Sequence, residues 1–385
     1  MSRYQVRVIN SLAEFRTIGD QWNRLVEATP LDHAYMRHEW FSCWIEAYNA
    51  GDHLAVVTLW QGDSLVAAAP LRRAVESKRG ISIRLLKFLQ SPVSPRCNII
   101  STTPDQMQQI IQAMYTLPDW DLLILENLEE SMPSTQQLAG LIATEKDIRG
   151  RITEGRQSPF MSITGTWDDY LTSLNSARRG YIKNECMKRL TKAKSHSLYR
   201  LHAAQDAENV FVVMHDVSGR SWKGAEGSAI GQLSAMQTFY ELYLPIALRL
   251  GHIDVWVLEI ESIIAGFDCC LTNGNNYSGI RSDYDTQLKY YHPGENMRIA
   301  VIRRLFDSGK PGEYDMGGDA ALYKMKWATG IRRHLNITIV NDTWRAKGIA
   351  FSRYTLKPII ERIMKRTDSA PPTGGNPPPQ QGNTA

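Results

Sequence analysis

The sequence lacks the segments that would place it in a membrane or direct it to secretion. No apolar run among its 385 residues approaches the ~20 that a membrane span requires. The N-terminal stretch MSRYQVRVINS has no apolar core of the kind found in signal peptides. These absences predict a cytoplasmic protein without a transmembrane segment.

Cysteine is scarce, and its positions suit neither a metal site nor a disulfide framework. The chain has five cysteines, and none has the spacing of a zinc site. Cys269 and Cys270 are adjacent in a predicted strand, so their side chains point to opposite faces. We therefore expect buried free thiols in a reducing compartment and no metal site.

Common enzymatic signatures are also missing. The sequence contains no Walker A pattern, no GxSxG elbow, no GxGxxG and no HExxH. The net charge of +4 is too small to imply nucleic acid binding by itself. An apolar content of 43% and a charged content of 22% are typical of a globular protein.

The clearest pattern lies in residues 253–328. Apolar alternation and turn signals predict three antiparallel strands, a helix, a short strand and a last helix. Their predicted ranges are 253–259, 264–272, 277–283, 297–307, 313–316 and 320–328. Pro293 and Gly294 precede the first helix, so its amides and dipole form a candidate anion cradle.

Three segments in this half of the chain carry a resemblance to a known family. They are Ser221-Trp222-Lys223-Gly224 with Gly227, Pro293-Gly294, and Tyr314-Asp315-Met316-Gly317-Gly318 followed by Leu322-Tyr323-Lys324 and Trp327. In this order they resemble the GNAT superfamily of acyltransferases. The closer resemblance is to its two-lobed members, which include Fem-like peptidoglycan aminoacyltransferases and cellulose-biosynthesis-associated (CelD-type) acetyltransferases. It covers roughly residues 5–345.

The resemblance implies a bacterial N-acyltransferase with no permanently bound cofactor. Acyl-CoA, or an acyl-carrier protein, is the implied donor. The implied acceptor is an amine or hydroxyl of an amino sugar, a polysaccharide precursor or an amino acid, with peripheral association to polysaccharide machinery. Two alternatives stay open: a non-catalytic regulatory or assembly protein of an exopolysaccharide system, and an aminoacyl-tRNA-dependent aminoacyltransferase.

The first half of the chain repeats the pattern of the second. LAVVTLWQGDSLVAAAPL echoes IDVWVLEIESIIAGFDCCL, and a strand, a helix and a strand follow each. This echo predicts an α/β (α+β) fold of two tandem GNAT-like lobes, each a mixed, mostly antiparallel sheet flanked by helices. We expect a degenerate lobe in residues 1–165, a catalytic lobe in 166–345, a helix in 346–366 and a disordered tail in 367–385.

A basic stretch opens the second lobe. Residues 178–200 hold eight Lys or Arg and one acidic residue, Glu185. The stretch is either a solvated helix face or a site for phosphate, an anionic polymer or tRNA. Fem relatives that use tRNA commonly carry a long coiled-coil arm, and this chain has no room for one, which argues against nucleic acid.

The candidate catalytic residues are Asp283, Asp315, Tyr323 and Lys324. Asp283 ends the third strand, where it is either a general base or a solvated turn carboxylate. Asp315 lies among apolar neighbours, so burial would raise its pKa unless Lys324 or Arg281 pairs with it. The resemblance places Tyr323 near the departing sulfur. Lys324 is either catalytic or the structural partner of Asp315.

Two sets of binding residues complete the predicted site. The cofactor-binding set is Pro293, Gly294, Glu295, Asn296 and Arg298, and the substrate-binding set is Trp222, Lys223, Gly224 and Arg281. The single glycine departs from the usual superfamily loop, and Arg298 is expected to compensate. Trp222 has a core position as its alternative. A helix over 35–48 has an aromatic face, expected in the core or between the lobes, or else as a wall for an acyl chain.

Overall fold

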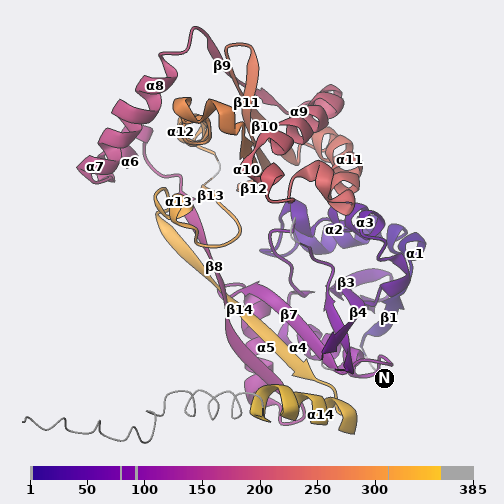
Figure 1. Cartoon of the computed structure of the whole chain (residues 1–385). Helices are drawn as coiled ribbons and strands as arrows, with labels where there is room; N and C mark the ends of the chain where they lie inside the picture. The colour runs from indigo at the N-terminus through magenta and orange to yellow at the C-terminus, as the bar shows by residue number, and fades with distance from the viewer. Residues whose placement is uncertain (1–2, 79, 92–93, 311, 357–385) are drawn as a thin grey trace, which may run out of the picture.

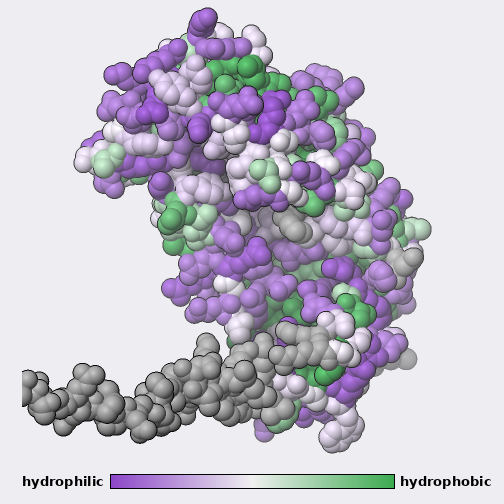
Figure 2. All heavy atoms as spheres, viewed as in Figure 1, coloured by the Kyte–Doolittle hydropathy of each residue, from purple (hydrophilic) through white to green (hydrophobic). Residues whose placement is uncertain are grey.

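The computed structural model describes residues 3–78, 80–91, 94–310 and 312–356. Figure 1 shows two lobes, one above the other, with two long strands running between them. Figure 2 shows hydrophilic residues over most of this face, including the region where the lobes meet. Within the described residues, no helix is long and apolar enough to cross a membrane.

The first lobe holds seven of the described strands and five α-helices. The strands are β1 (Gln5–Ile9), β2 (Val56–Gln61), β3 (Ser64–Ala69), β4 (Leu71–Lys78), β5 (Ile81–Phe88), β6 (Ile100–Ser101) and β7 (Leu122–Glu129). The helices are α1 (Leu12–Arg16), α2 (Gly19–Glu27), α3 (His38–Ala47), α4 (Pro104–Tyr115) and α5 (Pro133–Thr144). Short turns η1 (Ala34–Met36) and η2 (Gly51–His53) flank α3.

The second lobe follows the order predicted for residues 253–328. Its strands are β9 (His196–Leu201), β10 (Ile253–Ile260), β11 (Ile263–Asn273), β12 (Asn276–Tyr284) and β13 (Glu313–Asp315). Its helices are α6 (Trp167–Ser173), α7 (Ser176–Gly180), α8 (Lys188–Leu190), α9 (Ala207–Arg220), α10 (Trp222–Ala225), α11 (Ser234–Arg249), α12 (Pro293–Ser308) and α13 (Leu322–Met325). Its turns are η3 (Tyr181–Met187), η4 (Ala204–Asp206), η5 (Ile230–Gln232) and η6 (Thr286–Tyr291).

Two strands are exchanged between the lobes. β8 (Gly150–Ser162) pairs with β13 of the second lobe, and β14 (Gly330–Val340) lies between β7 of the first lobe and β8. The result is one ten-stranded sheet, β4-β5-β7-β14-β8-β13-β12-β11-β10-β9, beside a small sheet β1-β2-β3-β6. The last strand therefore leaves the lobe in which the sequence pattern places it.

The two halves share one local arrangement. β4 and β5 are antiparallel and β5 is parallel to β7, just as β11 and β12 are antiparallel and β12 is parallel to β13. A helix that begins with proline, α4 or α12, links each parallel pair. This agrees with the predicted mixed sheets; whether the lobes superpose stays a prediction.

Aromatic side chains join the lobes. The Trp40 ring on α3 lies 4.8 Å from Phe239 and 5.0 Å from Tyr243 on α11, measured between ring centroids. All three rings are buried. The aromatic face of α3 is thus core and inter-lobe surface rather than a wall for an acyl chain.

The remaining elements differ in places from the predicted ranges. α11 is one helix that continues through Pro245. β8 is one unbroken strand, and the helix expected in 320–328 forms only over α13. α14 (Trp344–Phe351) and η7 (Ser352–Leu356) follow β14. The remainder of the predicted helix 346–366, and the tail 367–385, lie outside the described residues. All five cysteines are free and buried, as expected.

Candidate functional site

The parallel strands β12 and β13 separate soon after they begin. They pair only through Asn276–Ser278 and Glu313–Asp315, although β12 continues to Tyr284. After β13 the chain turns away at Gly317 and Gly318, whose φ angles of 57° and 58° disfavour other residues. Among the described strands, none pairs with this edge of β12 beyond Ser278, so no strand hydrogen-bonds the backbone there; the Ser282 carbonyl accepts from Lys223 instead.

The N-terminus of α12 lies at the end of β12. Pro293 occupies the first turn, and Gly294 packs against the ring of Tyr284. The side chains of Glu295 and Asn296 are not free, which corrects their predicted role. Glu295 pairs with Arg178 at 3.2 Å, and the Asn296 amide donates to the carbonyl of Cys186 at 2.9 Å. Both therefore hold the basic segment in place, and only the backbone amides of the helix start remain for an anion.

Arg178 was not singled out by the sequence, yet it forms an ion pair with Glu295 in the first turn of α12. Its guanidinium lies 4.4 Å from the Trp327 ring and 5.2 Å from Tyr181, and its buried Nε has no hydrogen-bond partner among the described residues. A cavity of about 540 Å³ lies beside it, lined by residues of α7 and by residues 325–328. Arg178 therefore lies at the edge of this cavity and, through its ion pair with Glu295, connects it to the first turn of α12.

Asp283 is buried among cations rather than exposed as a base. It is 1% exposed, forms an ion pair with Lys223, and accepts from Arg281 Nε at 2.8 Å. Lys223 also donates to the Ser282 carbonyl at 3.1 Å, and burial lowers its pKa. Arg281 donates in addition to the Ser218 hydroxyl at 2.8 Å. Asp283 therefore positions two cations, which corrects both alternatives considered for it.

The SWKG segment divides into an exposed part and a packed part. Trp222 is 48% exposed, so it does not fill the core. Gly224 makes no room for a ligand: a Cβ built on it would overlap the backbone oxygen of Gly219 in the preceding helix. The glycine serves close packing of α10 on α9, which corrects its substrate-binding assignment.

We expect Gly224→Ala to lower the free energy of unfolding by about 1–3 kcal/mol, because its Cβ meets backbone that cannot rotate away. Gly219→Ala is the matched control. Its Cβ has no neighbour within 4 Å, and alanine is favoured in a helix by about 0.5–1 kcal/mol. Urea unfolding of both variants measures the difference. Equal stabilities would mean that α10 can shift, and would return Gly224 to the binding hypothesis.

Asp315 is paired, but not with the predicted partners. It forms an ion pair with Arg96 of the first lobe and lies 3.4 Å from Arg332 of β14. Arg281 is bound to Asp283, and the Lys324 amine donates to the Gly317 carbonyl at 2.6 Å. Asp315 therefore lies in a contact between the lobes and not among the groups available for proton transfer.

Lys324 and Tyr323 lie close to each other and to the guanidinium of Arg298. The Arg298 guanidinium is 5.6 Å from the Tyr323 ring, and the tyrosine is 52% exposed. Burial, reinforced by Arg298 and Lys223, lowers the pKa of Lys324 to about 8. A lysine of this kind is partly neutral near physiological pH, so it can accept a proton.

Asp268 completes this group and was missed. It is 2% exposed on β11, its Oδ2 has no hydrogen-bond partner among the described residues, and burial raises its pKa. The negative charge of Asp268 favours the protonated forms of Tyr323 and Lys324 and so acts to raise the pKa of both. The signal was present in the sequence, because Asp268 is the one charged residue in the apolar strand pattern 264–272.

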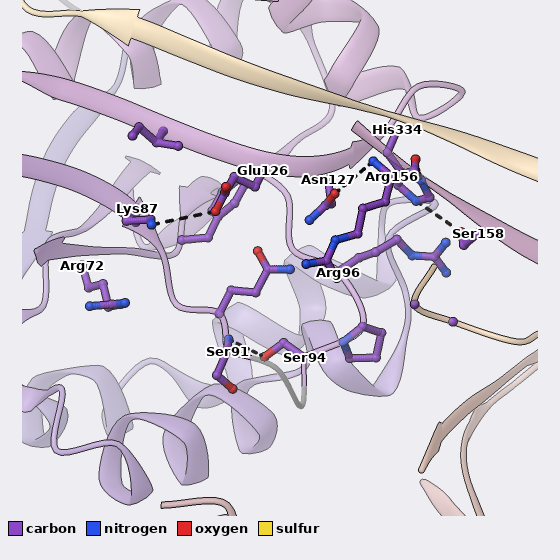
Figure 3. A pocket seen from close by; sticks show the side chains of 16 residues that line it. Arg72, Lys87, Ser91, Ser94, Arg96, Glu126, Asn127, Arg156, Ser158 and His334 are labelled. Atoms are coloured by element: carbon purple, nitrogen blue, oxygen red, sulfur yellow. Dashed lines mark hydrogen bonds and ion pairs between the residues drawn. The ribbon is translucent and has the colours of Figure 1, made fainter. Parts of the chain in front are cut away.

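A second opening lies between the lobes. This cleft has a volume of about 330 Å³. Arg72, Lys87 and Glu126 lie at one end, and Arg156, Ser158 and His334 lie at the other (Figure 3). Gly317 and Gly318 also line it. The carbonyl of Gly317 accepts a hydrogen bond from Lys324, so one lining residue of the cleft contacts the proton-accepting group.

Comparisons with known proteins find one family domain and several structures with a similar fold. Residues 178–325 match the family described as "Acetyltransferase (GNAT) domain". FemX is similar in structure, with a TM-score of 0.53 and 10% identity over 84% of this chain and 96% of that chain. L-PGS from Bacillus licheniformis has the same TM-score, with 11% identity over 87% and 96%. A search of curated proteins finds no match.

A conserved protein of unknown function from Bacteroides thetaiotaomicron also has a TM-score of 0.53, with 10% identity over 88% of this chain and 100% of that chain. At such identities these similarities show the fold alone. The family match covers β9–β13 and therefore includes the separating strands β12 and β13. Residues 178–325 are therefore similar to a GNAT acetyltransferase domain, and the chain as a whole shares its two-lobed fold with FemX.

Proposed function

We propose that the protein transfers an acyl group from acyl-CoA to an amine of an amino sugar, a polysaccharide precursor or an amino acid. The observation that carries this proposal is the opening between β12 and β13. The free edge of β12 offers backbone groups to a ligand that itself contains amides, as the pantetheine arm of coenzyme A does. The α12 start stands at one end of the opening, and Lys324 lies on its other side.

The phosphates of the donor bind between the start of α12 and Arg178, which lines the 540 Å³ cavity and pairs with Glu295 of the first turn. The α12 amides and dipole favour an anion, and Arg178, although paired with Glu295, adds a guanidinium charge that the glycine-poor loop lacks. Arg298 lies deeper, beside Tyr323, where it stabilises negative charge developing near the thioester.

Transfer then needs two proton movements. The acceptor amine attacks the thioester carbon, the carbon–sulfur bond breaks, and the neutral amine of Lys324 takes the proton released by the attacking nitrogen. Lys324 keeps its hydrogen bond to Gly317, which holds its lone pair in a fixed direction. The Tyr323 hydroxyl protonates the leaving thiolate and recovers a proton from solvent, to which this side chain is open.

Binding of coenzyme A tests the donor assignment. At 100 times its dissociation constant, coenzyme A should stabilise the protein by about 2.7 kcal/mol. Arg178→Gln should weaken that stabilisation, because it removes the cation at the helix start. Arg179→Gln is the control, since Arg179 donates to the Thr172 carbonyl at 3.1 Å and lies outside the cavity lining.

Differential scanning fluorimetry with and without ligand separates loss of binding from loss of folding. No stabilisation of the wild-type protein by coenzyme A or acyl-CoA would contradict an acyl-CoA donor. It would favour a non-catalytic role or an aminoacyl-tRNA donor, for which the exposed cations of residues 183–194 would be the contact surface.

A further inference from the structure

The inter-lobe cleft has two cations side by side at its first-lobe end. The register of β4 and β5 places Arg72 directly opposite Lys87, and Lys87 lies opposite Ile124 on β7. Residues directly opposite on neighbouring strands share a face, and like charges in this position repel. An energetic cost is therefore built into this end of the cleft.

Only one of the two cations has acidic partners. The Lys87 amine lies 3.5 Å from Glu76 and 3.9 Å from Glu126. Within the described residues the Arg72 side chain has no ion pair and no hydrogen bond, its Nε is buried without a partner, and its aromatic contact is the Trp44 ring at 5.8 Å. A half-buried cation without a counter-charge is destabilising unless a ligand supplies one.

We infer that an anionic group of the acyl acceptor, a phosphate or a carboxylate, binds between Arg72 and Lys87. This inference rests on the proposed acyl transfer for the identity of the ligand as acceptor. The planar guanidinium of Arg72 suits the two oxygens of either group, and the Lys87 ammonium, whose acidic neighbours lie at 3.5 and 3.9 Å, is a further donor. Phe88 and Ile124 supply apolar surface beside them.

The position of the anionic end also sets the length of the acceptor. From β4 to β8 the cleft crosses four strand spacings in the order β4-β5-β7-β14-β8, which is roughly 19 Å. Gly317 lies at the β8 end, because the amide of the preceding Met316 donates to the Pro159 carbonyl of β8. The acceptor is therefore an extended molecule, with its anion near Arg72 and its reacting amine near Gly317, and a single amino acid is too short.

Calorimetric titration without any acyl donor tests the anionic end. The anionic probes are D-glucosamine 6-phosphate and D-glucuronate, which distinguish a phosphate from a carboxylate. D-glucosamine, which has neither group, is the control ligand. Arg72→Gln is compared with Arg73→Gln, the next residue of the same strand. Arg73 is on the opposite face, where it donates to the Pro118 carbonyl at 2.6 Å, and it carries the same charge.

At least one anionic probe should bind the wild-type protein, and D-glucosamine should bind far more weakly. Arg72→Gln should raise the dissociation constant of that probe roughly 10- to 100-fold, while Arg73→Gln should change it less than about three-fold. Failure of both anions to bind, equal binding of D-glucosamine, or an equal effect of the two variants would overturn the inference.

The outcome is independent of the donor experiment. Coenzyme A binding without anion binding would overturn the anionic acceptor alone and leave acyl transfer standing. Anion binding dependent on Arg72, without coenzyme A binding, would leave the anion site standing and overturn the donor assignment.

Discussion

Replacing Lys324 by methionine is expected to lower turnover by roughly 10²- to 10⁴-fold, with the affinity for coenzyme A within a few-fold of wild type. The reason is the position of the amine. It is held by the Gly317 carbonyl at 2.6 Å, next to the opening of β12, and no buried acid forms an ion pair with it in the described structure. Methionine keeps the length of the side chain and removes the proton acceptor.

The pH dependence distinguishes a proton acceptor from a packing residue. Since burial lowers the pKa of Lys324 to about 8, turnover should rise with pH and level off above about 8. The folded protein binds this proton less tightly than the unfolded chain, whose lysine titrates near its ordinary value. The free energy of unfolding should therefore also rise between about pH 8 and pH 10.5. Both effects should be absent in Lys324→Met.

Lys289→Met is the matched control, because Lys289 is an exposed lysine of the same lobe. It should retain the turnover and the pH profile of the wild type. A fully active Lys324→Met enzyme in an established transfer assay would remove Lys324 from the mechanism. A variant that loses stability and activity together would instead assign it a structural role.

Sequence pattern predicted the second lobe well because its signals are local. The alternation in β10 and β11 and the turn at Asn273-Gly274 belong to adjacent residues, and each keeps its meaning in the folded chain. The exchange of β8 and β14 has no such signal. Which strand lies beside β7 depends on packing between segments far apart in sequence, and a strand pattern does not name its partner.

The site residues divide in the same way, into those predicted from local sequence and those whose contacts depend on distant segments. Tyr323, Lys324 and Arg298 were predicted and lie together. The predicted Asp315–Lys324 pair was wrong because the true partner, Arg96, belongs to a loop of the other lobe. Local sequence cannot rank distant cations as partners for a buried carboxylate. The ionic contact between the lobes is therefore the feature that most needs a direct test.

Arg96→Met is expected to lower the free energy of unfolding by about 3–5 kcal/mol, because it removes one of the two cations that pair, in the described structure, with the buried carboxylates Asp315 and Glu129. Arg96 is 9% exposed and forms ion pairs with Asp315 of β13 and, at 3.4 Å, with Glu129 of β7. Arg332 is then the one remaining cation for both acids within the described structure. Urea unfolding at constant pH measures the loss.

Arg156→Met is the control for this test, since Arg156 and its partner Asp319 are largely exposed and such pairs contribute about 0–1 kcal/mol. The double variant Arg96→Met/Asp315→Leu adds a second criterion. Replacing both members of a buried pair by apolar residues is often nearly neutral, so the double variant should lose less than the two single changes added together. Additive losses, or an Arg96→Met cost below about 1 kcal/mol, would show that this contact does not hold the lobes together. The shared strands and the α3–α11 aromatic contact would then account for their association.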